Sequence, residues 1–212
     1  MIGIILSIIA AYLLGSIPTA VWVGKTFYGV DVRNEGSGNA GATNVIRVLG
    51  LKAGIPVLLV DVLKGYFAVI LVRQIVHATG GADISPLIEI IAAAAAVIGH
   101  TLPVFAGFRG GKGVATLLGV GFGLFPYAAW VALAIFAVVL ASTHYVSLGS
   151  ITAGVTFPFF VAFVFPPPHW TYMILAVMVA LFLPWTHRKN ILRLLNGTEP
   201  KMNFKKTKTA KK

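Results

Sequence analysis

Residues 114–142 read VATLLGVGFGLFPYAAWVALAIFAVVLAS, an apolar run without a charged side chain that Pro126 interrupts near its middle. A helix needs about 20 apolar residues to cross a bilayer, and proline breaks the hydrogen bonding of a helix interior. By length alone the run is therefore one tilted membrane helix or two short helices joined at Pro126. The choice decides whether the segments before and after the run lie on the same side of the membrane.

The rest of the chain also has the composition of a membrane protein. Of its 212 residues, 58% are hydrophobic and 11% are charged, and the mean hydropathy is +0.89. Further apolar runs predict spans at residues 2–23, about 55–75, about 86–105, 150–165 and 170–184. The first run has no basic residues before it and is long for a signal sequence, so we expect it to be retained. The absence of cysteine excludes disulfides, thiolate metal sites and a cysteine nucleophile.

The basic residues decide between one and two helices at residues 114–142. Lysine and arginine gather in three regions, at residues 25–52, at 109–112 and in the tail from 188 onward, and are missing from the connections at 77–85 and 166–169. Two short helices place all three basic regions on one face, which the positive-inside rule makes cytoplasmic. We therefore predict an all-α membrane protein with seven short transmembrane helices, its N-terminus outside and its C-terminus cytoplasmic.

The distribution of apolar and basic residues also predicts the domain organisation and the partners. We expect residues 1–204 to form a single seven-span domain with its active-site loops in the cytoplasm, and residues 205–212 to form a basic, disordered tail. The net charge of +11 is carried by loops between apolar segments and by the tail. This placement indicates membrane topology and anionic ligands, and we expect the lipid bilayer, not nucleic acid, as the partner of a monomer.

Two polar loops stand out from the apolar background. The first glycine loop, residues 34–47, reads NEGSGNAGATNVIR, and the second, residues 108–113, reads FRGGKG. Glycines bring backbone N–H groups close to a ligand, and Arg47 and Lys112 add cations that suit phosphate. The first loop alone would favour a simple turn between helices, but the repeated pattern predicts anion binding.

The predicted topology brings these loops together with residues 143–150 and 187–190 at the cytoplasmic surface. His187 and Asn190 share one face of a short helix, because they are three residues apart. With the cations and N–H groups of the loops, they would bind one or two phosphate groups. Asp31 and Glu35 read as exposed, so no carboxylate there is a good general base. No His, Asp or Glu cluster has the spacing of metal ligands, and we predict a site without metal or cofactor.

Other ionisable residues lie within the predicted spans. Asp61 and Lys64 share a helix face and should pair, either as a functional group or as a neutralised structural brace. His100, near the inner end of its span, is read as a structural group in preference to a catalyst. We expect Glu89 and Asp83, towards the outer face, to meet only solvent or lipid headgroups.

Four motifs, in order over the whole chain, resemble the bacterial acyl-phosphate:glycerol-3-phosphate acyltransferase family. They are residues 37–47 (SGNAGATNVIR), 99–116 (GHTLPVFAGFRGGKGVAT), the turn at 147–150, and 187–199, with HRKNILRL and GTE. The resemblance implies a seven-span inner-membrane enzyme that moves a fatty acyl group from acyl phosphate to the 1-hydroxyl of glycerol 3-phosphate, giving lysophosphatidic acid and phosphate. Other glycerolipid acyltransferases carry a histidine five residues before an aspartate, which none of the five histidines here has.

We assign the catalytic site from these motifs. The catalytic residues are predicted to be Ser37, Arg47, Lys112, His187 and Asn190. The predicted phosphate-binding residues are Gly36, Gly38, Asn39, Gly41, Thr43, Asn44, Arg109, Gly110, Gly111, Gly113, Ser147 and Ser150. The hydroxyl proton would pass to a substrate phosphate or to His187, and Ser37 would bind without being acylated. The alternative is a transporter of a small phosphorylated anion, although the polar motifs lie on one face and no repeat relates the two halves.

Overall fold

The computed structural model describes residues 2–80 and 84–203, and every regular element in these ranges is helical. The helices are α1 (Ile2–Gly15), α2 (Thr19–Tyr28), α3 (Ala42–Leu49), α4 (Leu51–Ala78), α5 (Pro86–Thr101), α6 (Val114–Leu124), α7 (Pro126–Thr143), α8 (Val146–Phe159), α9 (Tyr172–Thr186) and α10 (Arg188–Leu195). Three short elements join them: η1 (Val32–Asn34), η2 (Val104–Ala106) and the π-helical η3 (Phe160–Val164). The predicted tail at 205–212 lies outside the described residues.

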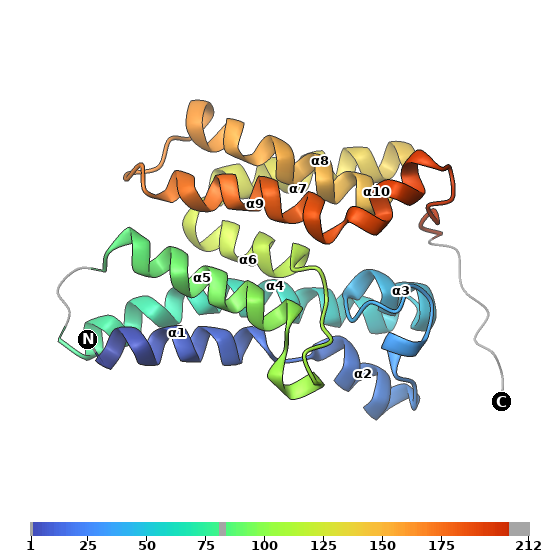
Figure 1. Cartoon of the computed structure of the whole chain (residues 1–212), viewed down its shortest axis with the longest axis horizontal. Helices are drawn as coiled ribbons and strands as arrows, with labels where there is room; N and C mark the ends of the chain where they lie inside the picture. The colour runs from blue at the N-terminus through green and yellow to red at the C-terminus, as the bar shows by residue number, and fades with distance from the viewer. Residues whose placement is uncertain (1, 81–83, 204–212) are drawn as a thin grey trace.

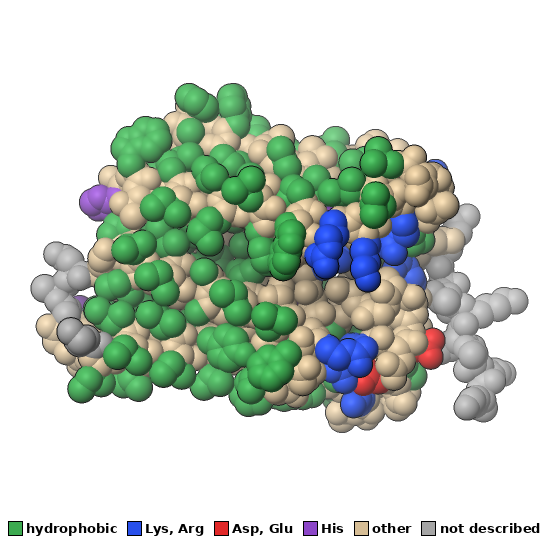
Figure 2. Space-filling model, viewed as in Figure 1, with side chains coloured by type: hydrophobic (Ala, Val, Ile, Leu, Met, Phe, Trp, Pro, Cys, Tyr) green, Lys and Arg blue, Asp and Glu red, His purple; other side chains and the backbone are tan. Residues whose placement is uncertain are grey.

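Five helical stretches are long and apolar enough to cross a bilayer: Ile2–Tyr28, Leu51–Ala78, Pro86–Ala106, Pro126–Thr143 and Val146–Val164. Helices α6 and α9 are apolar but shorter. Many large apolar side chains lie exposed on these helices, as a lipid-facing surface requires. Figure 2 shows hydrophobic side chains over most of the molecule, whereas lysine and arginine gather near one end, where α2, α3 and α10 lie in Figure 1.

Residues 114–142 form two helices, because α6 ends at Leu124 and α7 begins at Pro126. The chain reverses between them. Lys112, before α6, donates a hydrogen bond to Asn190, and His144, after α7, accepts one from the backbone N–H of Met202. Both outer ends of the pair therefore lie beside the C-terminal segment, which is the hairpin predicted from the basic residues.

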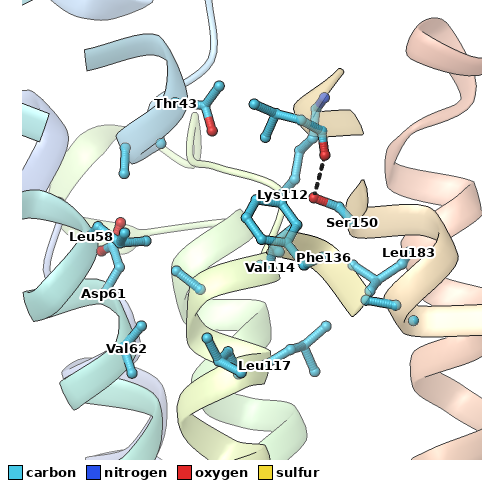
Figure 3. A pocket seen from close by; sticks show the side chains of 18 of the residues that line it. Thr43, Leu58, Asp61, Val62, Lys112, Val114, Leu117, Phe136, Ser150 and Leu183 are labelled. Carbon is cyan, nitrogen blue, oxygen red and sulfur yellow. Dashed lines mark hydrogen bonds between the residues drawn. The ribbon is translucent and has the colours of Figure 1, made fainter. Parts of the chain in front are cut away.

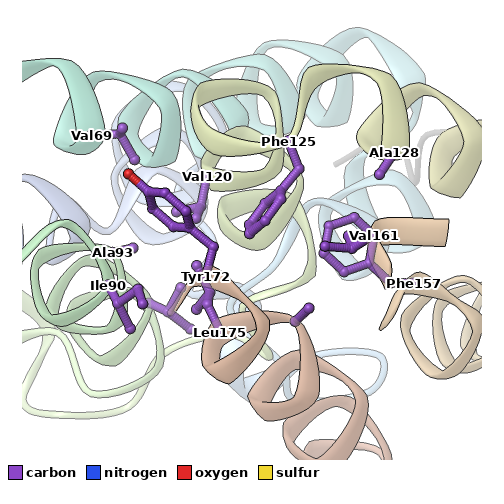
Figure 4. Packing of buried hydrophobic residues seen from close by; sticks show 12 residues of the cluster. Val69, Ile90, Ala93, Val120, Phe125, Ala128, Phe157, Val161, Tyr172 and Leu175 are labelled. Atoms are coloured by element: carbon purple, nitrogen blue, oxygen red, sulfur yellow. The ribbon is translucent and has the colours of Figure 1, made fainter. Parts of the chain in front are cut away.

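Helix α6 lies between two layers of helices. Helices α1, α4 and α5 form one layer, and α7, α8 and α9 form the other (Figure 1). The backbones of α4 and α6 approach so closely that a Cβ at Gly119 would lie 1.9 Å from the carbonyl oxygen of Val62. Buried side chains from both layers meet around α6, with Phe125 between Phe157 and Tyr172 (Figure 4).

The prediction that Glu89 meets solvent or headgroups is wrong. Glu89 is 1% exposed, and its carboxylate accepts hydrogen bonds from Arg73 Nε at 2.5 Å and from the Tyr172 hydroxyl. A buried carboxylate needs such partners. Here they come from α4 and α9, and the residue pattern of α5 alone cannot show that these helices lie beside Glu89. Asp83 lies outside the described residues.

The predicted pairing of Asp61 and Lys64 is confirmed. Lys64 Nζ lies 2.8 Å from Asp61 Oδ1 and also donates to the carbonyl oxygen of Ile17 at 3.0 Å. Ile17 lies in the break between α1 and α2, where backbone carbonyls lose their helical partners. The lysine thus fastens this break to α4, as a structural brace would.

Candidate functional site

A cavity of about 720 Å³ lies between α3, α4 and the helices α6 to α9. One end is polar and collects side chains from both glycine loops, from the start of α8 and from the C-terminal segment. The rest is lined mainly by apolar side chains of α4, α6, α7, α8 and α9, and Asp61 and His100 also line the cavity. Figure 3 shows Thr43, Lys112 and Ser150 around the polar end, with Leu117 further along α6.

The first glycine loop is shaped by Asn44, which is buried. Its Oδ1 accepts from the backbone N–H of Ser37 at 2.8 Å, and its Nδ2 donates to the carbonyls of Val32 (2.7 Å) and Glu35 (3.0 Å). Gly36 has φ +59°, and a Cβ there would lie 2.5 Å from Asn44 Oδ1. Asn44 therefore uses its polar atoms to hold the loop. This places Ser37, Asn39 and the start of α3 along the cavity, where the helix dipole favours an anion.

Arg33 links the segment just before the first glycine loop to the segment just before the second. It forms two hydrogen bonds with the carboxylate of Asp31, at 2.9 and 2.7 Å, and donates to the carbonyl of Ala106 at 2.7 Å. The prediction that Asp31 is exposed is therefore wrong, whereas Glu35 is exposed as predicted. The hydrogen bonds from Arg33 hold the pKa of the Asp31 carboxyl well below its usual range, so this carboxylate is a paired anion and a poor base.

Lys112 extends from the second glycine loop into the cavity. Its Nζ donates to Asn190 Oδ1 at 2.5 Å. Burial lowers the pKa of Lys112 to about 8, an effect that nearby Glu199 opposes and that Arg193 and Arg47 reinforce. The three cations Lys112, Arg47 and Arg193 lie near one another here. The fourth residue, Glu199, is an anion, so a net positive charge remains that would stabilise an anionic ligand.

Gly110 and Gly111 of the second loop lie outside the cavity lining. The backbone N–H groups of Gly110 and Gly111 donate to the carbonyls of Thr101 (3.2 Å) and His100 (3.1 Å). A Cβ at Gly111 would lie 2.1 Å from His100 Nε2. The N–H groups predicted to hold phosphate are thus already bonded to the end of α5, and exposed Arg109 also lies outside the lining.

Glu199 organises the C-terminal side of the site. It is 8% exposed; its Oε1 accepts from Ser147 Oγ (2.7 Å) and Asn190 Nδ2 (2.6 Å), and its Oε2 accepts from Arg193 Nε (2.8 Å). Burial alone would raise its pKa, but these hydrogen bonds together hold the pKa of Glu199 below its usual value. Glu199 is therefore an ionised anchor that orients Asn190, whose Oδ1 is left for Lys112.

His187 lies behind the cavity and does not line it. Its ring is 3% exposed, and its Nδ1 lies 2.8 Å from the carbonyl oxygen of Leu183. That contact makes Nδ1 the protonated nitrogen, because a carbonyl only accepts. Burial and the charge of Lys112 lower the pKa of His187 to about 4. The imidazole is therefore neutral at pH 7 and cannot bind phosphate as a cation.

The structure brings most of the predicted site residues to one cavity. The predicted residues that line it are Ser37, Asn39, Gly41, Thr43, Asn44, Arg47, Lys112, Gly113, Ser147, Ser150 and Asn190. Those outside the lining are Gly36, Gly38, Arg109, Gly110, Gly111 and His187. Sequence reasoning assigned no role to Arg193 and Glu199, which line the polar end. Their spacing of six residues gave no helix-face signal, since Glu199 lies beyond the end of α10.

Residues 5–197 match the family model described as glycerol-3-phosphate acyltransferase. A glycerol-3-phosphate acyltransferase of Fusobacterium nucleatum is 44% identical over 93% of this chain and 97% of its own length, and one of Listeria monocytogenes is 42% identical over 96% and 98%.

A crystal structure of PlsY (YgiH), an integral membrane glycerol 3-phosphate acyltransferase in its glycerol 3-phosphate form, is also similar. It superposes with a TM-score of 0.82 and 40% identity over 94% of this chain and 96% of that one. Its lysophosphatidic acid form gives a TM-score of 0.80. Together with the apolar helices, this similarity identifies a multi-pass membrane protein. The resemblance in the sequence motifs is thereby confirmed, and the chain belongs to the glycerol-3-phosphate acyltransferase family.

Proposed function

We propose that the protein transfers a fatty acyl group from acyl phosphate to the 1-hydroxyl of glycerol 3-phosphate, forming lysophosphatidic acid and phosphate. One observation carries this proposal: a single cavity joins a cationic, hydrogen-bonding end to a long apolar passage between membrane helices. A substrate with a charged head and a hydrocarbon tail matches both parts. The relatives named for glycerol 3-phosphate supply the acceptor, and the lipid-like passage favours a lipid-like donor.

We place the enzyme in the inner membrane with its site facing the cytoplasm. The five long apolar stretches and the two shorter helices α6 and α9 support seven spans. The polar end of the cavity lies where the basic residues gather, which the positive-inside rule assigns to the cytoplasm (Figure 2). The N-terminus then lies outside and the C-terminus inside, as an odd number of spans requires.

The reaction needs positive charge around two anions. The acceptor oxygen attacks the acyl carbonyl carbon, a new C–O bond forms, and the bond from that carbon to the phosphate oxygen breaks, so that phosphate leaves with the electron pair. Arg47, Lys112 and Arg193 supply cations for the phosphate groups and for the charge that develops at the carbonyl. In this proposal the transfer is direct and metal-free, and these side chains stabilise the negative charge.

A substrate phosphate takes the hydroxyl proton in this proposal. A phosphate monoester has a second pKa near 6, close to the operating pH. His187 is a weaker candidate, because its pKa is lowered to about 4 and its ring lies outside the cavity lining. We assign His187 to fixing the α9–α10 junction and thereby Asn190. Asn190 follows it by three residues, and the backbone N–H of Asn190 donates to the His187 carbonyl at 2.8 Å.

Purified protein in detergent or vesicles tests the activity directly. We expect radiolabelled glycerol 3-phosphate and acyl phosphate to give labelled lysophosphatidic acid with stoichiometric release of phosphate. Acyl carrier protein or coenzyme A thioesters, supplied alone, should give none. Uptake of labelled glycerol 3-phosphate into sealed vesicles without any acylated product would overturn the proposal in favour of a transporter.

A further inference from the structure

The apolar part of the cavity follows α6 from its first residue to its end. Leu117 and Gly121 lie on successive turns of this helix, Phe125 directly follows its last residue, and all three line the passage. At the far end the passage meets five buried residues, Val120, Phe125, Ala129, Phe157 and Leu175, whereas Trp130, next to Ala129 on α7, also lines the cavity and is exposed. By contrast, the α4 side of the cavity is formed by exposed residues such as Leu58 and Leu59 and opens towards lipid.

Phe125 forms the end wall of this passage. Its ring meets Phe157 edge to face at 5.5 Å between centroids and Tyr172 at 5.9 Å (Figure 4). The Tyr172 hydroxyl donates to the buried carboxylate of Glu89, which Arg73 also holds. Phe125 is thus fixed against α8 and α9, and through Tyr172 against α4 and α5, so the wall has little freedom to move away from a longer ligand.

We infer that Phe125 determines the longest acyl chain that the enzyme accepts, an inference that rests on the proposed function. From Val114 to Leu124 the helix rises about 15 Å, which matches an extended hydrocarbon chain of roughly a dozen methylenes. Methylenes beyond that length would meet the ring or leave the passage for the open α4 side. Phe125 thereby has a role in specificity, and the Arg73–Glu89–Tyr172 network has a role in positioning Phe125.

The test measures kcat/KM for a series of acyl phosphates from 12 to about 20 carbons. Phe125→Ala should move the profile to longer chains and raise the efficiency ratio of a longer donor to one two methylenes shorter roughly tenfold, since each buried methylene adds hydrophobic stabilisation. Val179→Phe, one turn of α9 nearer the polar end than Leu175, should move the profile to shorter chains. Phe163→Ala is the control, because that ring is 76% exposed and lies outside the lining.

Opposite shifts in the two variants support the inference, and a purely structural defect would lower kcat/KM equally for every chain length. If Phe125→Ala does not purify as a folded protein, the shift in Val179→Phe still decides. An unchanged profile in folded variants would overturn the inference and place the acyl chain on the open side near Leu58. Absence of acyl transfer in the wild type at every length would instead overturn the proposed function itself.

Discussion

The first glycine loop, residues 34–47, and the second, residues 108–113, both combine glycines with a cation, yet they meet the cavity differently. In the first, Asn44 holds the backbone from inside, and Ser37, Asn39 and Thr43 face the cavity. In the second, Gly110 and Gly111 are bonded to the end of α5, and Lys112 alone carries its side chain to the polar end. Similar composition thus forms a cavity-facing surface in one loop and places one lysine in the other.

The comparison predicts its largest effect at Lys112. Lys112→Ala removes the cation that the second loop delivers and leaves a substrate phosphate without its partner. We expect kcat/KM to fall about a hundredfold, equivalent to roughly 3 kcal/mol of transition-state stabilisation. Lys52→Ala, which removes an exposed lysine outside the cavity lining, is the control for general charge. Near wild-type turnover in Lys112→Ala would mean that this lysine only marks membrane topology.

Arg47, the last residue of the first glycine loop, tests whether the geometry of the hydrogen-bond donors matters when the charge is kept. Arg47→Lys keeps the cation but loses the two-pronged donor, so we expect kcat/KM to fall by roughly tenfold or more. Arg109→Lys makes the same exchange at an exposed position outside the cavity lining and should change little. Equal effects at the two positions would show that bulk charge attracts the substrate and that no built site distinguishes them.

Substitutions within the loops should separate ligand contact from packing. Thr43→Ala removes a hydroxyl that lines the cavity, so we expect a several-fold loss of kcat/KM with an unchanged melting temperature. Gly111→Ala places a Cβ 2.1 Å from His100 Nε2. We therefore expect both a lower melting temperature and a raised KM, because the loop that carries Lys112 must shift. Loss of activity in Gly111→Ala at full stability would mean that the substrate approaches the backbone at Gly111 after all.

The same contrast explains which parts of the site were predictable from sequence. Apolar length, Pro126 and the distribution of basic residues carried enough information for most of the long helices and for the hairpin of α6 and α7, although the break between α1 and α2 within the predicted span 2–23 was not foreseen. Composition also marked both loops, because glycines and hydrogen-bonding side chains are conspicuous in an apolar chain. The direction of each N–H group was not encoded locally. Whether Gly111 faces a ligand or His100 depends on how α5 ends, and the partners of Glu89 and Glu199 come from other helices.

A pH profile examines the charge state of Lys112. Its pKa is lowered to about 8, so the free enzyme loses this cation as the pH rises through about 8. The kcat/KM for the anionic substrates should therefore decline above that pH and be constant just below it. In Lys112→Arg the guanidinium stays charged, so the decline near pH 8 should disappear even if the rate is lower. A decline that persists in Lys112→Arg would assign it to another group.

The smallest effect on kcat is expected at His187. With its pKa lowered to about 4, this imidazole is neutral across the working range, and a base so weak accepts a proton poorly near pH 7. His187→Asn and His187→Gln can donate towards the Leu183 carbonyl as the Nδ1–H does, but neither can act as a base. Both should keep substantial kcat with a raised KM, and any limb near pH 6 should remain, because a substrate phosphate titrates there. Collapse of kcat in both variants, with substrate binding intact by calorimetry, would restore His187 as the base. An acyl group trapped on Ser37 would overturn direct transfer altogether.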